Sequence, residues 1–156
     1  MPDKDEAIER FEGSRAAFRG RIEDLPDEAY GEAWLGTWNL SQLLAHMSGW
    51  LREMAPAFER VARGERANRP DADYSDFDAW NARFAEQALP GRAALEDFDA
   101  ACSDYLEQAR GLSEEHYGVD AERAQPRIGD RLLEGTGIGH FTEHGEQVEE
   151  WLSSRS

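Results

Sequence analysis

Hydrophobic residues near the start of the chain recur at helical spacing rather than at every second position. The stretch from Lys4 to Asp24 therefore predicts an amphipathic first helix. Pro26 follows it and is expected to end it, because proline lacks the backbone N–H that continues a helix. The apolar positions with this spacing are Ile8, Phe11, Ala16, Phe18, Ile22 and Leu25.

A second apolar stripe predicts a helix from Leu40 to about Ala62. Asn39 or Ser41 is suited to cap its start, because a short polar side chain accepts hydrogen bonds from the free backbone amides there. Gly64 lies just past the predicted end, where glycine commonly stops a helix. The stripe consists of Leu40, Leu43, Leu44, Met47, Leu51, Met54 and Phe58.

The second half of the chain predicts two further helices around a segment that is hard to interpret. Residues 65–75 form a polar connection that is long enough for a crossover. Helical spacing then runs over Phe77–Gly111, with a kink or break expected at Pro90. Residues 112–134 show only a weak helical pattern, and the spacing predicts a final helix over Thr136–Ser153.

Four amphipathic helices and no run of alternating β-branched residues predict an all-α fold, with residues 1–156 forming a single domain. Helices with one apolar stripe each bury those stripes against one another in a four-helix bundle. Sites in such bundles are built from side chains that face one another near the axis.

The charge and composition of the chain limit the classes of partner that it is expected to bind. Its 33 acidic and 17 basic residues give a net charge of -16, which would repel a phosphate backbone, so we expect no nucleic acid partner. The only cysteine, Cys102, cannot form an intramolecular disulfide, and the first ten residues are charged where a signal peptide is apolar, which predicts a cytoplasmic protein. We expect no membrane partner, because no apolar run approaches the roughly 20 residues of a spanning helix.

Three of the four histidines lie on predicted helix faces that can converge. His140 and His144 are four positions apart, which puts both imidazoles on one helical face, and His46 lies on the apolar stripe of the second helix. Three imidazoles leave coordination positions free for water or substrate, and they suit zinc, nickel, copper or iron. The alternative is a hydrogen-bonded core histidine and an unrelated pair on the surface.

Two segments of the sequence resemble the DinB-like metal-binding family. Trp38–Trp50, with the sequence WNLSQLLAHMSGW, is similar to the family's signature around its first metal histidine. Gly139–His144, with the sequence GHFTEH, resembles the family's terminal helix, as do Val148 and the trailing Trp151. The features that look most like the ClbS/DfsB branch are Gly64, Trp80-Asn81 and the long helix to Leu112.

The resemblance implies an up-down-down-up bundle with long crossover connections, often a homodimer, in which His46, His140 and His144 bind one divalent ion, with zinc or nickel favoured. Similar proteins include thiol-dependent transferases that use bacillithiol, mycothiol or glutathione, isomerases, and resistance proteins that open a reactive cyclopropane. The function implied is a metal-dependent S-transferase or hydrolase acting on a small electrophile, with a low-molecular-weight thiol as candidate co-substrate. The alternatives are a ClbS-like protective hydrolase that needs no metal and a non-catalytic protein that binds a small molecule or metal.

Some residues near the predicted ligands are candidates for further roles. Glu53 shares a helical face with His46, and Glu143 precedes His144. Either carboxylate is a candidate to orient an imidazole or to act as general base, and the alternative for both is a solvated surface position. The candidates for the wall of a substrate pocket are Trp50, Trp151, Asn81 and Tyr105. For the aromatic residues among them, the alternative is packing in the core.

Two other patterns predict no catalytic role. Gly135–Gly139, with the sequence GTGIG, follows no strand and lacks the full dinucleotide-binding fingerprint. We expect these glycines to let the helix backbone approach a neighbour. Cys102 lies on an apolar stripe and is expected to be an inert core thiol.

Overall fold

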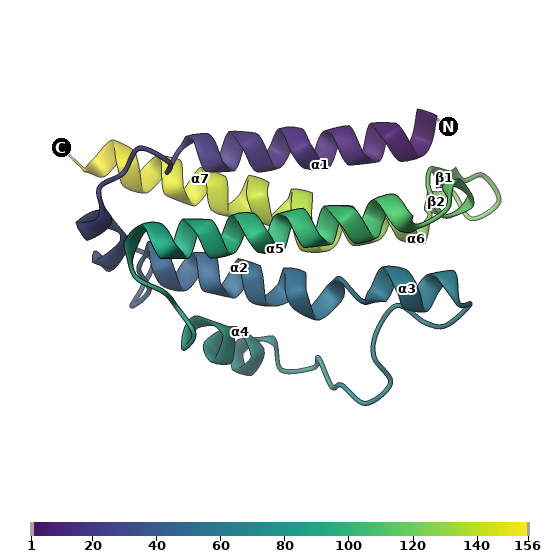
Figure 1. The fold of residues 1–156 in the computed structure, drawn as a ribbon, viewed down its shortest axis with the longest axis horizontal. Helices are drawn as coiled ribbons and strands as arrows, with labels where there is room; N and C mark the ends of the chain where they lie inside the picture. Colours follow the sequence, from purple (N-terminus) through teal and green to yellow (C-terminus); the bar gives the residue numbers. More distant parts are fainter. Residues whose placement is uncertain (1, 156) are drawn as a thin grey trace.

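The computed structural model describes residues 2–155, whose long helices lie side by side in a bundle (Figure 1). α1 (Pro2–Gly20) and α7 (Gly139–Ser154) run in one direction, and α2 (Leu40–Met54) and α5 (Gly91–Gly111) run in the other. This is the up-down-down-up order that the sequence resemblance implies. Because α2 and α5 are parallel, the chain must return along the whole bundle between them, and the long connection after residue 62 does so.

Short elements occupy the connections. α3 (Ala57–Ala62) continues beyond α2, and α4 (Phe77–Ala85) packs against α2 from within the crossover. α6 (Ile128–Leu133) leads through a π-helical turn, η3 (Glu134–Ile138), directly into α7. The remaining elements are η1 (Asp27–Gly31), η2 (Glu114–His116) and two antiparallel strands, β1 (Val119–Asp120) and β2 (Gln125–Pro126).

The apolar stripes meet in one core, as their spacing predicts. Phe11 of α1 stacks on Tyr105 of α5 with ring centroids 5.8 Å apart and meets Phe141 of α7 edge-on at 5.2 Å. Phe18 of α1 and Phe98 of α5 also pack together, with ring centroids 5.5 Å apart. Each of these five rings is at most 1% exposed, so they join α1, α5 and α7 along their length. None of the helices within residues 2–155 combines the length and the apolar character needed to cross a bilayer.

The second predicted helix starts as expected but is interrupted. Asn39 accepts a hydrogen bond from the Gln42 amide at 2.8 Å, and the Gln42 side chain accepts one from the Asn39 amide at 2.9 Å, which forms a capping box. The prediction of an unbroken helix to Ala62 is wrong, because Pro56 has no N–H to donate and divides the stretch into α2 and α3. Gly64 ends α3 with φ of 80°, as predicted.

The other predicted boundaries also shift. The first helix ends at Gly20 and gives way to turns before Pro26. The long third helix is broken rather than kinked, because Pro90 precedes a new helix that begins at Gly91 with φ of 51°. The last helix begins with Gly139, after a π-helical turn and the α6 helix that the pattern only weakly indicated.

Gly49 permits a close approach between α2 and α4. A Cβ atom at Gly49 would lie 2.2 Å from the ring of Phe84, whereas one at Gly13 on the exposed face of α1 would meet nothing within 4 Å. We expect Gly49→Ala to lower the free energy of unfolding by about 1–3 kcal/mol, the usual cost of overpacking. Gly13→Ala is expected to raise it by about 0.5–1 kcal/mol through helix propensity. Urea denaturation measures the free energy of unfolding of both variants. Equal changes in the two would contradict the close packing at Gly49.

Candidate metal centre

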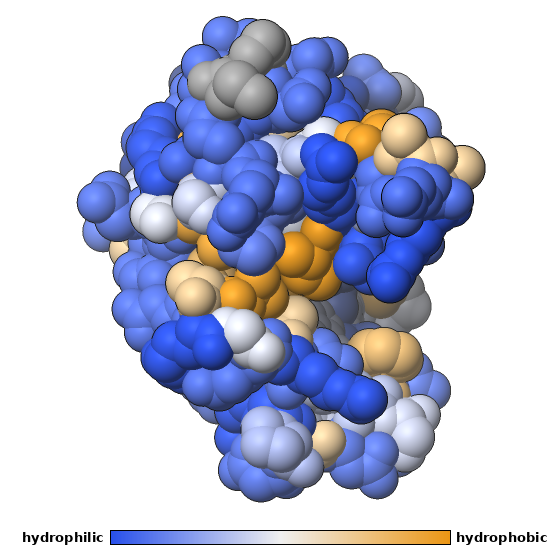
Figure 2. Space-filling view, turned by 90° about the vertical axis from the view of Figure 1, so that its right-hand side faces the viewer, coloured by the Kyte–Doolittle hydropathy of each residue, from blue (hydrophilic) through white to orange (hydrophobic). Residues whose placement is uncertain are grey.

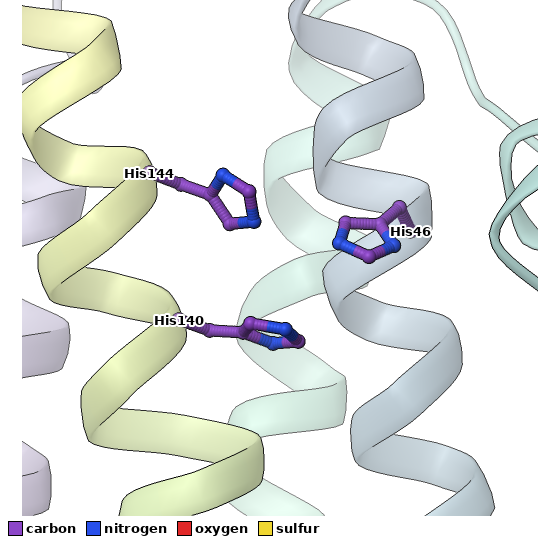
Figure 3. Close-up of side chains that lie close together, drawn as sticks. All are labelled: His46, His140 and His144. Carbon is purple, nitrogen blue, oxygen red and sulfur yellow. The ribbon is translucent and has the colours of Figure 1, made fainter. Parts of the chain in front are cut away.

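The three predicted histidines come together between two helices. His46 projects from α2, and His140 and His144 project toward it from successive turns of α7 (Figure 3). The ring centroids lie 5.2 Å apart for His46 and His140, 5.4 Å for His46 and His144, and 5.3 Å for His140 and His144. One ligand atom from each residue lies within 4.8 Å of the other two, so the three nitrogens can hold a single ion with small side-chain adjustments.

Burial keeps two of these imidazoles neutral. His46 is 5% exposed, and burial together with repulsion from His140 and His144 lowers its pKa to about 3. Burial and repulsion from His144 lower the pKa of His140 to about 4, although the nearby Glu143 carboxylate opposes the shift. Nδ1 of His46 and Nδ1 of His140 are buried without a hydrogen-bond partner. Neutral imidazoles are the form that binds metals, so this donor set fits a divalent cation.

The third imidazole is oriented by a glutamine. Nδ1 of His144 lies 2.7 Å from Oε1 of Gln147, one turn later on α7. An amide oxygen can only accept, so this contact favours the tautomer with the proton on Nδ1, in which Nε2 presents a lone pair. Metal-binding histidines commonly have such a partner on the other ring nitrogen. Sequence reasoning missed Gln147, although its position three residues after His144 on the same helical face is a signal that was available.

Removal of this partner is expected to weaken zinc binding without unfolding the protein. For Gln147→Leu we expect zinc affinity to fall about 10–100-fold, because the His144 ring loses the contact that fixes its tautomer and orientation. Competition with a chromophoric chelator measures the affinity, and Gln108→Leu on α5, outside this site, is the matched control. Unchanged zinc affinity in Gln147→Leu would show that the contact has no orienting role.

A cavity of about 370 Å³ opens beside the histidines. His46 and His140 form part of its wall, next to Trp50 and Asn81, so two of the four residues predicted for a pocket lie here. Figure 2 looks at the end of the bundle near α3 and the β1–β2 hairpin and shows apolar surface between the upper body of the molecule and its lower part. The other lining residues are Met54, Asn68, Tyr74, Phe77, Gly135 and Thr136.

Side-chain contacts anchor the crossover to α2 on one side of the cavity. The Trp50 indole N–H of α2 donates to Asn81 Oδ1 of α4 at 2.6 Å. Within the crossover, the Trp80 indole N–H donates to the Asp73 carbonyl at 2.7 Å. Trp50 also meets the rings of its neighbours at centroid distances of 5.3–5.7 Å. The rings around Trp50 are Tyr74, Phe77, Trp80 and Phe84.

The two candidate carboxylates lie outside the cavity wall. Glu53 Oε2 accepts a hydrogen bond from Arg69 Nε at 2.8 Å and another from the Tyr74 hydroxyl, so it fixes the crossover in place. It reaches the cavity only through Tyr74, which is a lining residue. Glu143 is exposed and acts on His140 through its charge alone. The structure therefore brings neither carboxylate to a position from which it contacts a molecule in the cavity.

Trp151 and Tyr105 also lie away from the cavity. Trp151 stacks on Trp34 at 4.7 Å, beside a separate surface hollow. Tyr105 is fully buried, and its hydroxyl donates to the Leu132 carbonyl at 2.5 Å, which is the core position that the alternative interpretation expected. Cys102 is also buried, and burial raises its pKa to about 12, so its thiol stays protonated.

The glycine-rich turn brings a helix close to its neighbour, as predicted. A Cβ atom at Gly137 would lie 2.3 Å from the ring of Phe11 in α1. The same turn is π-helical, and Gly135 and Thr136 from it line the cavity. π-Helical turns are frequent at functional sites, yet no sequence pattern in this stretch indicates one.

Comparisons with known proteins agree with this architecture. Solved structures that resemble the chain include DfsB, described as a sibling lethal factor precursor (14% identity, TM-score 0.79, 99% of this chain and 98% of that one). An uncharacterised protein from Clostridium difficile 630 is similar as well (11% identity, TM-score 0.78, 98% and 97%). A third is the colibactin self-resistance protein ClbS in complex with double-stranded DNA (13% identity, TM-score 0.76, 96% and 95%). At these identities the likeness establishes the fold. No curated protein sequence matches the chain.

A family profile extends the likeness from fold to sequence. The profile of the DinB superfamily matches residues 10–148, a span that includes His46, His140 and His144. The sequence segments around these histidines carry the same resemblance, and two of the similar structures, ClbS and DfsB, come from the branch that the other motifs indicated. The chain therefore belongs to the DinB superfamily.

Proposed function

We propose that His46, His140 and His144 bind one divalent metal ion, zinc or nickel, and that the protein is a metal-dependent S-transferase or hydrolase acting on a small electrophilic molecule. One observation supports this above the others: two of the three histidines form part of the wall of a cavity large enough for a small molecule. A site that only stabilised the fold would have no need of such a cavity, because structural ions are enclosed by protein ligands.

A divalent ion held by three imidazoles supplies Lewis acidity toward a water or thiol at its remaining positions. The residues of the chain hold this ion and shape the cavity beside it. Trp50 and Phe77 form an apolar side of the cavity against which a ligand would pack, and the contact with Gln147 favours the His144 tautomer that presents a lone pair. In S-transfer the thiol sulfur bonds to the electrophilic carbon and the thiol proton goes to the leaving or ring-opened group; in hydrolysis water takes the place of the thiol.

A turnover measurement separates the enzyme from its alternatives. Zinc-loaded protein is incubated with 1-chloro-2,4-dinitrobenzene and bacillithiol, mycothiol or glutathione in turn, and with p-nitrophenyl acetate alone. We expect product to exceed protein many-fold with at least one pair, and this turnover to disappear in His144→Ala. Product limited to one equivalent would indicate a binding protein, and full turnover after chelator treatment would indicate a hydrolase that needs no metal.

We propose a small molecule, rather than nucleic acid, as the partner. The ClbS structure contains double-stranded DNA, so this fold does not by itself exclude DNA. The expectation for the present chain rests on its net charge of -16, which opposes contact with phosphates. Fluorescence anisotropy with labelled duplex DNA at about 150 mM salt is expected to show no binding, and binding that weakens steeply with added salt would refute the expectation.

The formation of a homodimer also stays a prediction, and sedimentation analysis tests it.

A further inference from the structure

Among residues 2–155, no aspartate, glutamate, lysine or arginine lines the cavity. Glu53 and Arg69, which bind each other, lie behind the wall, where Glu53 also accepts a hydrogen bond from Tyr74. A cavity wall without charged residues stands out in a chain with 33 acidic and 17 basic residues. In the metal-free protein, a charged group of a ligand inside the cavity would therefore find no counter-charge on the wall, and burying an unpaired charge is costly.

The apolar side of the cavity has an incompletely covered aromatic surface. Phe77 is 59% exposed, although it is the first residue of α4 and its ring lies 5.5 Å from Trp50. Together with Tyr74, whose ring is 5.7 Å from Trp50, it forms an aromatic wall. A flat apolar molecule placed against this wall would bury Phe77 and gain the offset or edge-on contacts that aromatic pairs favour.

The polar side offers donors rather than charges. An indole N–H only donates, so the bond from Trp50 Nε1 fixes the Asn81 oxygen on that side. The Asn81 side chain also interacts with His46, and because an NH₂ group has two hydrogens, one remains as a donor for a ligand. Thr136 and Asn68 are further uncharged polar residues of the wall. A volume near 370 Å³ is at the lower end of the range of about 300–1,000 Å³ for small-molecule sites.

We propose that the cavity takes an uncharged small molecule with one flat aromatic or apolar face, which packs on Trp50, Tyr74 and Phe77, and with a carbonyl-type acceptor for Asn81. This names the substrate class for the site assigned under the proposed function and rests on that assignment.

Three naphthalene probes of similar size test the ligand class: neutral 2-acetylnaphthalene, anionic 2-naphthoate and cationic trimethyl(2-naphthyl)ammonium. Isothermal titration uses metal-free full-length protein, so that no carboxylate binds through an ion. We expect one equivalent of the neutral probe to bind at least about 10-fold more tightly than either charged probe. Equal or tighter binding of either charged probe overturns the inference.

Two variants locate the binding. Phe77→Ala is expected to weaken the neutral probe by roughly 2–10-fold, the value of one aromatic pair. Val119→Ala, which removes a similarly exposed apolar side chain from the distant hairpin, is expected to leave it unchanged. An unchanged affinity in Phe77→Ala overturns the inference, since the probe then binds elsewhere.

A zinc titration of the same samples keeps the two proposals apart. Zinc binding at one equivalent without neutral-probe binding overturns only the ligand class. Neutral-probe binding without zinc binding overturns the metal centre and leaves the uncharged ligand standing.

Discussion

Replacement of His144 by alanine is expected to abolish stoichiometric zinc binding while leaving the helical fold intact. Wild-type protein should take up one equivalent, and His144→Ala should lose affinity by more than the roughly 10–100-fold that follows loss of an orienting hydrogen bond. The reason is geometric: among residues 2–155, three donor atoms of histidine, cysteine or acidic side chains lie within 4.8 Å of one another at this site, and two imidazoles hold an ion weakly in water. Elemental analysis after dialysis measures the stoichiometry.

Thermal and chemical stability give a second measure of the same change. At free zinc about 100-fold above the dissociation constant, the wild-type protein should gain about 2.7 kcal/mol, because the folded state alone binds the ion. His144→Ala should gain nothing at that concentration. His116→Ala is the control, since His116 lies on η2 outside the triad and should leave both zinc measurements unchanged. One full equivalent of zinc retained by His144→Ala would rule out the proposed centre.

Acidification is expected to destabilise the metal-free protein through two of the same histidines. His46 and His140 have folded-state pKa values near 3 and 4, whereas both titrate near 6.5 when unfolded. Between these values the unfolded chain binds more protons than the folded one, so the stability present above pH 6.5 is lost as the pH falls toward 4. From pH 7 to pH 5 we expect a loss of about 2–4 kcal/mol, at roughly 1.4 kcal/mol per pH unit for each group.

Urea denaturation in the presence of a chelator at pH 7 and pH 5 measures this loss. The many carboxylates also respond to acid, so the informative quantity is the difference from His46→Leu/His140→Leu, which keeps the carboxylates and removes both buried imidazoles. The double variant should lose about 2–4 kcal/mol less than wild type over the same interval. Identical losses in the two proteins would mean that the buried imidazoles do not control the acid response.

Local patterns in the sequence predicted much of the fold and the three histidines. Helical spacing identified the buried faces because a side chain's direction along a helix depends only on its position in the turn. The Asn39 cap and the Gly64 stop were predictable for the same reason, since each depends on its immediate neighbours. The break at Pro56 was equally local and was overlooked.

The roles of Glu53, Trp151 and Tyr105 depended on contacts that no local pattern describes. Glu53 is bound by Arg69 and Tyr74, which lie 16 and 21 residues further along the chain. The Tyr105 hydroxyl finds its partner 27 residues away, at Leu132. Helical spacing places each side chain on a face, but it does not say which segment covers that face.

By itself, the sequence determined the helices, the apolar faces and the pairing of His140 with His144, because these follow from the repeat of a single helix. The meeting of that pair with His46, and the cavity beside them, were decided only by tertiary structure. Tyr74 and Phe77 reach the site because the crossover folds back over α2, where Gly49 leaves room for Phe84 and Trp50 binds Asn81. Such packing is set by contacts between distant segments, which a pattern along one helix does not encode.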